Sequence, residues 1–279
     1  MRLSRLTPQQ LLTKSPVLKF FYDKICKSTD INESLSGNIS EYISKYNEIN
    51  NLNISDIQTI YHNFIRKYNK DILNFKETGL YPAQLTPDIQ VPDRVEYDVI
   101  LLISCLVSPH RYMMMDLLTK NTQTGDKALF VGCGPGLEIA LLQAHFSETH
   151  AFDIELNPQL RRLMPKVKFY QELFPSINAP ATFDAIYLIE ILEHLSDPWQ
   201  LLRNCANALS LYGRLHLTTA TNIPQFDHLY NFDSDHSVFE KRLKDMGLSV
   251  FENVALEHDY KDTSIKAKNH YYVFVWSNT

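Results

Sequence analysis

The stretch FVGCGPGLEIALL (residues 130–142) joins an apolar, strand-like run to a helical pattern of apolar residues through three alternate glycines. A glycine-rich turn between a strand and a helix holds anionic or zwitterionic groups on its exposed backbone N–H groups. Pyrophosphate and the amino-acid-like end of a cofactor are both candidates. The spacing is G-x-G-x-G, whereas a dinucleotide fingerprint needs glycine where Leu137 stands. This spacing argues against a nicotinamide-dependent oxidoreductase.

Strand and helix patterns alternate around this turn. The expected strands cover residues 127–133, 149–155, 167–171, 183–189 and 213–220, and a helix over 197–210 opens at Ser196 or Asp197. Such alternation predicts an α/β fold with a Rossmann-like, doubly wound parallel sheet. Two further expected strands, 248–258 and 270–277, have no helix between them. They predict an antiparallel pair that closes one edge of the sheet.

The N-terminal third of the chain carries helical patterns and no catalytic motif. The strongest pattern begins at Ser55, and Gln58 completes a capping-box signature there. Three prolines in residues 79–93 are typical of an extended connector. We therefore expect an N-terminal all-helical domain over residues 1–92 and a second domain over residues 93–279. The helical domain would serve as a lid over an acceptor pocket or as an arm that forms a homodimer.

Composition and charge restrict the class of protein. Hydrophobic residues are 44% and charged residues 21%, with a net charge of −5, an ordinary globular balance. The negative charge argues against a nucleic-acid partner, which usually needs a basic surface. The sequence has no apolar run long enough for a membrane span, and its N-terminus lacks the apolar segment of a signal peptide. Four cysteines without C-x-x-C spacing predict free thiols and a cytoplasmic location.

Asp153 ends the second expected strand, 19 residues after Gly134. A carboxylate at that place can accept hydrogen bonds from both hydroxyls of a ribose. The alternative is a helix cap within the sequence DIELNP (residues 153–158). Together with the glycine turn, Asp153 indicates a nucleoside joined to a group that backbone amides hold.

Residues 110–279 resemble the class I S-adenosylmethionine-dependent methyltransferases, and particularly the branch with the ubiquinone-biosynthesis O-methyltransferases. The matching features are the three glycines, Asp153, Phe183-Asp184 opening the fourth strand, Glu193-His194 after it, and Tyr212-Gly213 before the fifth strand. The resemblance implies S-adenosylmethionine as cofactor. In one departure, Phe130 stands where the family usually has the Asp or Glu that helps to hold the cofactor's ammonium group. The ammonium would be left to backbone carbonyls, Glu138 or Glu190.

The resemblance also implies a set of cofactor-binding residues. The glycine turn, with Cys133 in it, would contact the methionine portion, Asp153 the ribose hydroxyls and Ile154 the adenine face. Glu172, after the third strand, would make a polar contact to adenine. Ile189 and Glu190, at the end of the fourth strand, would face the methionine and sulfonium. The cofactor-binding prediction therefore comprises Gly132, Cys133, Gly134, Gly136, Asp153, Ile154, Glu172, Ile189 and Glu190.

The expected activity is transfer of a methyl group to an oxygen or nitrogen of a small-molecule acceptor. Alternatives are an RNA wobble-base methyltransferase and a non-catalytic partner subunit with the same fold, which the Phe130 departure favours. Transfer requires alignment and the removal of at most one proton. His194 is the first candidate for the base and His228 the second, followed by His236 and His110. We expect no metal, because the later Asp-Asn pair of the catechol-type enzymes is missing.

Overall fold

The computed structural model describes Pro8, Leu12 and residues 15–28, 31–85, 92–175, 182–259 and 265–277. Before the sheet come α2 (Pro16–Ser28), α3 (Glu33–Ile49), α4 (Ile54–Thr78), α5 (Pro82–Leu85), α6 (Arg94–Val107) and α7 (Pro109–Asn121). The first half of the sheet region has β1 (Gly125–Val131), α8 (Leu137–Leu142), β2 (Phe146–Asp153), α9 (Leu160–Leu163), β3 (Lys168–Gln171) and β4 (Phe183–Leu188). It continues with α10 (Pro198–Ala208), β5 (Leu209–Thr221), α11 (His236–Asp245), β6 (Leu248–Asp259) and β7 (Lys266–Trp276).

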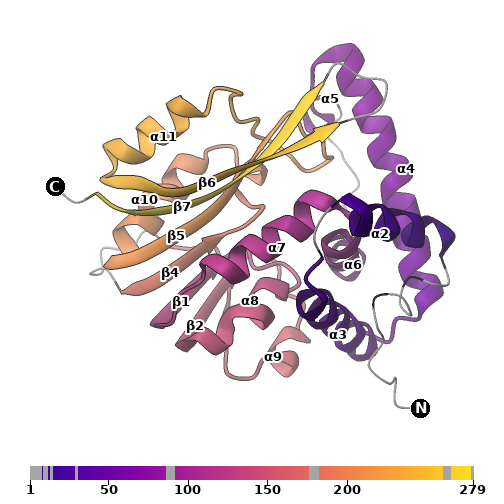
Figure 1. The fold of residues 1–279 in the computed structure, drawn as a ribbon, viewed down its shortest axis with the longest axis horizontal. Helices are drawn as coiled ribbons and strands as arrows, with labels where there is room; N and C mark the ends of the chain where they lie inside the picture. The colour runs from indigo at the N-terminus through magenta and orange to yellow at the C-terminus, as the bar shows by residue number, and fades with distance from the viewer. Residues whose placement is uncertain are drawn as a thin grey trace.

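The strands form one sheet in the order β3-β2-β1-β4-β5-β7-β6 (Figure 1). The strands β1 to β5 pair in parallel, while β7 runs antiparallel to both β5 and β6. The predicted doubly wound sheet with an antiparallel C-terminal pair is confirmed. Because the chain order reverses between β1 and β4, the carboxyl ends of these strands flank the crevice where such folds bind ligands.

Helices cover both faces of the sheet. On one face, α10 and α11 bury a cluster that includes Leu202, Phe239 and Leu243 against side chains of β1, β4 and β5. On the other face, a single cluster runs from α2, α3 and α4 through α6 and α7 to α8 and the sheet. The N-terminal helices and the sheet thus share one continuous core, and they lie against each other in Figure 1.

Local signals set several helix boundaries. The predicted cap of α4 is wrong by two residues: Asn53 is the N-cap and forms a capping box with Asp56, in place of Ser55 and Gln58. The asparagine amide oxygen accepts from two backbone N–H groups there, which satisfies donors that the helix start leaves open. Asp197 caps α10, as one of the two expected residues. Residues 86–91 of the expected connector lie outside the described residues, and α5 occupies part of the rest. Among the helices that the structure describes, none has the length and apolar character that crossing a bilayer would require.

Candidate functional site

The glycine turn lies between β1 and α8, at the carboxyl edge of the sheet. Gly132, Gly134 and Gly136 have φ values of 68°, 49° and 76°, in the left-handed region, where a side chain would be strained. A Cβ at Gly132 or Gly136 would also come within 2.6 Å of Ile191 or Met164. Gly134 has more space, with ordinary contact distances around the position of a Cβ. Gly132 and Gly136 therefore pack closely against the protein itself, and Gly132 and Gly134 line a small cavity at the turn.

Asp153 lies at this turn, as the spacing predicts. Its carboxylate accepts the N–H of Gly134 at 2.9 Å and the N–H of Glu155 at 3.0 Å. Ile154 beside it is 69% exposed, so its side chain is available to cover a flat ring. Glu172 is exposed after the end of β3, and it does not line the cavity at the turn.

Helix α6 covers the turn. Leu101 Cδ1 and Arg94 Nη2 are 3.5 Å and 3.8 Å from the position that a Cβ of Gly134 would take. The second guanidinium nitrogen of Arg94, Nη1, lies 3.8 Å from Asp153 Oδ1. The remaining cavity, lined also by Cys133 and Ile189, has about 40 Å³, whereas ligand pockets hold about 300–1,000 Å³. Helix α6 thus leaves little free volume at the turn.

A buried polar network holds α6 in this place. Arg94 pairs with Asp98 at 2.8 Å, and the hydroxyl of Tyr46 in α3 donates to the same carboxyl group. Asn157, after β2, donates to Tyr46 Oη at 2.6 Å. Burial raises the pKa of Asp98 to about 6, although Arg94 and the Tyr46 hydrogen bond oppose this rise.

Phe130 fills the place of the family's carboxylate with a core side chain. Its ring is 2% exposed and stacks on Tyr187 with centroids 4.5 Å apart. Glu138, one of the expected substitutes, is partly buried, and burial raises its pKa. Glu138 and Glu190 both line the cavity at the turn. The residues present therefore fit S-adenosylmethionine through the turn amides, Asp153 and Glu190, with no carboxylate at position 130.

Glu190 is held in an unusual conformation. Its φ is 50°, which costs energy in a residue other than glycine. Its N–H donates to Thr218 Oγ1 at 2.7 Å, and its carboxylate pairs with Arg111 at 2.8 Å and accepts from Asn269 at 3.1 Å. These contacts from α7, β5 and β7 hold the carboxylate between the cavity at the turn and a second cavity.

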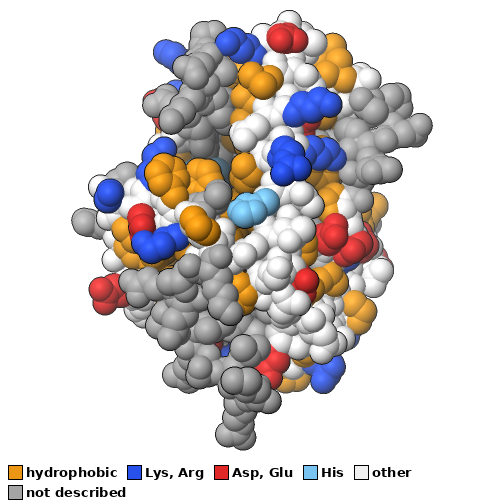
Figure 2. All heavy atoms as spheres, turned by 90° about the vertical axis from the view of Figure 1, so that its right-hand side faces the viewer, with side chains coloured by type: hydrophobic (Ala, Val, Ile, Leu, Met, Phe, Trp, Pro, Cys, Tyr) orange, Lys and Arg blue, Asp and Glu red, His pale blue; other side chains and the backbone are white. Residues whose placement is uncertain are grey.

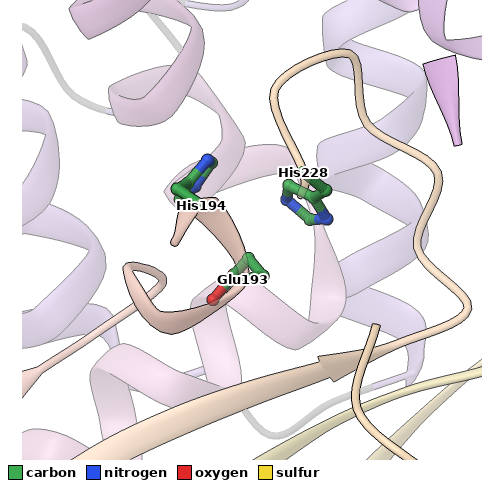
Figure 3. A group of neighbouring side chains, drawn as sticks. All are labelled: Glu193, His194 and His228. Carbon is green, nitrogen blue, oxygen red and sulfur yellow. The ribbon is translucent and has the colours of Figure 1, made fainter. Parts of the chain in front are cut away.

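The second cavity, of about 90 Å³, lies between the helices and the loops that follow β4 and β5. One wall is aromatic, with Tyr61, Phe64 and Tyr68 from α4. The opposite wall carries His194 and His228, whose ring centroids are 4.9 Å apart in an edge-to-face arrangement. The structure thus brings together the two histidines selected from the sequence, from the loops after β4 and β5 (Figure 3).

The two histidines have different electrostatic environments. Burial opposes charge on His194, but Asp227, whose carboxylate is 3.4 Å from Nδ1, and Glu193 outweigh it and raise the pKa. Burial, with His194 nearby, lowers the pKa of His228 to about 3. Burial, with Glu190 nearby, raises the pKa of Glu193 to about 8. Of the other candidates, His110 also lines this cavity, whereas His236 bonds Thr221 and Tyr272 and lies outside its lining.

A larger cavity, of about 370 Å³, lies at the opposite edge of the sheet. Its lining includes Gly125 at the start of β1 and Asp184 near the start of β4. Ligands of open α/β sheets bind beyond the carboxyl ends of the strands. We therefore place the functional site at the two smaller cavities beside the glycine turn.

Three charged residues of the site were missed from the sequence alone: Arg94, Asp98 and Arg111 serve there as partners of the predicted residues. One signal was present for the first two. Arg94 and Asp98 are four residues apart on a helix whose following residues, 99–107, are almost all apolar, and charges beside such a run are usually paired. For Arg111 no comparable signal exists in the sequence.

A family model and several known proteins match this chain. Residues 109–261, more than half of the chain, match the family model described as a methyltransferase domain. A ubiquinone biosynthesis O-methyltransferase of Xanthomonas campestris pv. campestris (strain B100) is 30% identical over 112 residues, which are 36% of this chain and 45% of that protein. The protein of the same description from Xylella fastidiosa (strain M23) is 32% identical over 116 residues, 38% of this chain and 46% of its own. The matches thus span about half the length of these relatives. Among solved structures, the N-methyltransferase NodS from Bradyrhizobium japonicum WM9 is similar with a TM-score of 0.46 and 16% identity, over 60% of this chain and 95% of its own.

Proposed function

Since the chain belongs to the methyltransferase domain family, we propose that it transfers a methyl group from S-adenosylmethionine, the family's cofactor, to an oxygen or nitrogen of a small-molecule acceptor. One observation carries this proposal. Gly134 and the carboxylate of Asp153 meet at the carboxyl edge of the sheet, and Glu190 connects that point to a cavity lined by aromatic side chains and two histidines.

The residues divide into two groups by what they would contact. The turn amides would hold the methionine end of the cofactor, Asp153 the ribose and Ile154 the adenine. S-adenosylmethionine supplies an electrophilic methyl group on a sulfonium. The protein has to align an acceptor with that methyl group and to exclude water. We assign the alignment of the acceptor to the second cavity. Its aromatic wall would hold the acceptor, and His194 and His228 would assist the removal of a proton from the acceptor's nucleophilic atom.

Binding of the cofactor tests the first group. We expect calorimetry to show micromolar binding of S-adenosylmethionine by the wild type. Asp153→Ala should weaken it by about 1–3 kcal/mol, because the ribose hydroxyls lose their acceptor. Glu155→Ala, an exposed carboxylate two residues further on, is the matched control and should bind like the wild type. Equal binding by the Asp153 variant would remove Asp153 from the site.

A second candidate function is that of a non-catalytic partner subunit with the same fold. Two observations favour it: Phe130 replaces the usual carboxylate in the core, and α6 leaves only about 40 Å³ at the turn. This candidate predicts that the wild type binds no S-adenosylmethionine in the same calorimetric experiment.

Location and assembly are part of the proposal. The four cysteines are free thiols, which supports a location in the reducing cytoplasm.

A homodimer through the N-terminal helices is supported by hydrophobic side chains at the surface. Phe20 and Leu73 on these helices are exposed, and Figure 2 shows hydrophobic side chains on the helical side of the molecule. Light scattering of the wild type and of Phe20→Ser/Leu73→Ser tests it. If the chain is a homodimer, the measured mass of the wild type is twice that of one chain, and the measured mass of the variant is lower.

A further inference from the structure

We propose that Glu193, His194 and His228 form a binding site for a divalent transition-metal ion beside the acceptor cavity. Each of the three offers one ligand atom, and these atoms lie within 4.8 Å of one another (Figure 3). Ligand atoms at about 2.1 Å from an ion are about 3–4 Å apart, so small side-chain shifts would bring them to that separation. The expectation of no metal was drawn from a missing Asp-Asn pair, and this site uses other residues.

The carboxylate of Glu193 supports this assignment. Glu193 is 0% exposed, and both of its oxygens lack a hydrogen-bond partner among the described residues. A buried carboxylate without hydrogen bonds is costly unless a cation stands beside it. The neighbouring charges already have partners: Glu190 pairs with Arg111, and Asp227 accepts from Tyr97 at 2.6 Å. Of Glu190, Glu193 and Asp227, Glu193 is therefore the one whose carboxylate oxygens are available to bind an ion.

The histidines are oriented as metal ligands usually are. A ligating imidazole generally bonds a carbonyl or carboxylate through its other nitrogen, which fixes the ring. His194 Nδ1 is 3.2 Å from the backbone oxygen of Asp227, which leaves Nε2 to ligate. His228 is 3% exposed and bonds the backbone of Ile223, while its Nδ1 has no partner among the described residues.

The ligand types select the kind of ion. Two imidazoles and one carboxylate suit zinc, iron or another first-row transition metal, whereas magnesium prefers oxygen ligands. Three protein ligands leave coordination positions open. In the methyl transfer proposed above, an ion at this site would lower the pKa of a hydroxyl group of the acceptor. Only this catalytic role of the ion rests on the proposed function. The hydroxyl proton would pass to water, the oxygen would bond the methyl carbon, and the electron pair of the C–S bond would remain on sulfur.

Metal binding by the full chain tests the site without any acceptor. We strip the purified protein with a chelator and titrate it with Zn²⁺ by calorimetry and with Co²⁺ by visible absorption. The expected result is one saturable equivalent of each, not displaced by millimolar Mg²⁺. Glu193→Gln and His228→Gln should each weaken Zn²⁺ binding at least tenfold. His236→Gln, a buried histidine outside the cluster, is the matched control and should bind like the wild type.

Two outcomes would overturn the proposal: no saturable binding of Zn²⁺ or Co²⁺ by the wild type, or unchanged affinity in both cluster variants. Circular dichroism of each variant shows whether weaker binding reflects unfolding. The titration of the wild type tests the site even if a variant does not fold. S-adenosylmethionine titrated into the same samples separates the two proposals. Metal binding without cofactor binding would contradict the methyltransferase function alone, and the reverse result would contradict the metal site alone.

Discussion

Asp98 is a carboxyl group held in the interior by residues from three elements. Arg94 of its own helix pairs with it and Tyr46 of α3 donates to it. Burial raises its pKa, and the like charge of Asp153 at the end of β2 adds to this rise. Its pKa in the folded protein is about 6, above the ordinary 3.8. The folded state therefore keeps this proton to a higher pH than the unfolded chain does.

The pH dependence of stability follows from this difference. The stability that protonated Asp98 contributes is present below about pH 4 and is lost as the pH rises through about 6. We expect the free energy of unfolding of the wild type, relative to Asp98→Asn, to fall by about 1–3 kcal/mol between pH 4 and pH 7. Urea unfolding of both proteins at the two pH values measures it. A constant or rising difference would show that Asp98 titrates normally.

At the same scale, substitution of His194 and His228 would separate the proposed methyl transfer from the binding of the cofactor. We expect His194→Ala/His228→Ala to lose at least about a hundredfold in methyl transfer, the usual range when a group acting on the proton is removed. Its affinity for S-adenosylmethionine should remain, because neither residue lines the cavity at the turn. Formation of S-adenosylhomocysteine is the readout, with His236→Ala as the control. Full turnover in the double variant would contradict their assignment.

At the scale of elements, helix α6 decides access to the glycine turn. Arg94 lies over Gly134 and faces the carboxylate that the ribose would need. We expect Arg94→Ala to bind S-adenosylmethionine several-fold faster in stopped-flow measurements, since less of the cover has to move. Arg162→Ala, an exposed arginine in α9, is the control. A slower association would mean that Arg94 guides the cofactor into the site instead of covering it.

The same scale shows where local sequence patterns were sufficient. The alternation of strands and helices predicted every parallel strand, and the absence of a helix between residues 258 and 270 predicted the antiparallel edge. Ends of elements were less well determined. The second strand was expected over residues 149–155, but β2 begins at Phe146 and ends at Asp153, because pairing with β1 extends β2 toward its start.

At the scale of the whole molecule, the division at residues 92 and 93 stays a prediction. The core on one face of the sheet includes Ile43 of α3, Ile103 of α6 and Tyr187 of β4 in one cluster. We expect calorimetry to show a single unfolding transition. Ile43→Ala should lower its midpoint, with a loss of about 2–5 kcal/mol, as should Leu202→Ala on the other face of the sheet. Two separate transitions, with Ile43→Ala shifting only the first, would instead support two independent domains.

The sequence by itself determined the sheet, its antiparallel edge and the position of the glycine turn. These follow from short-range information: glycines with positive φ, apolar periodicity and a carboxylate at a strand end act within a few residues of where they stand. Asp153 could be placed beside the turn for that reason, because β1 and β2 are adjacent and parallel and their carboxyl ends meet.

Only the tertiary structure decided what surrounds that turn. Arg94 reaches Asp153, Arg111 reaches Glu190, and His228 reaches Glu193 and His194 across separations that no local pattern encodes. Such contacts depend on how α6 and α7 pack against the sheet and on the course of the loop after β5. Burial and charge pairing act between elements, so the closed turn and the Glu-His-His cluster are properties of the packed molecule and not of any single stretch of its sequence.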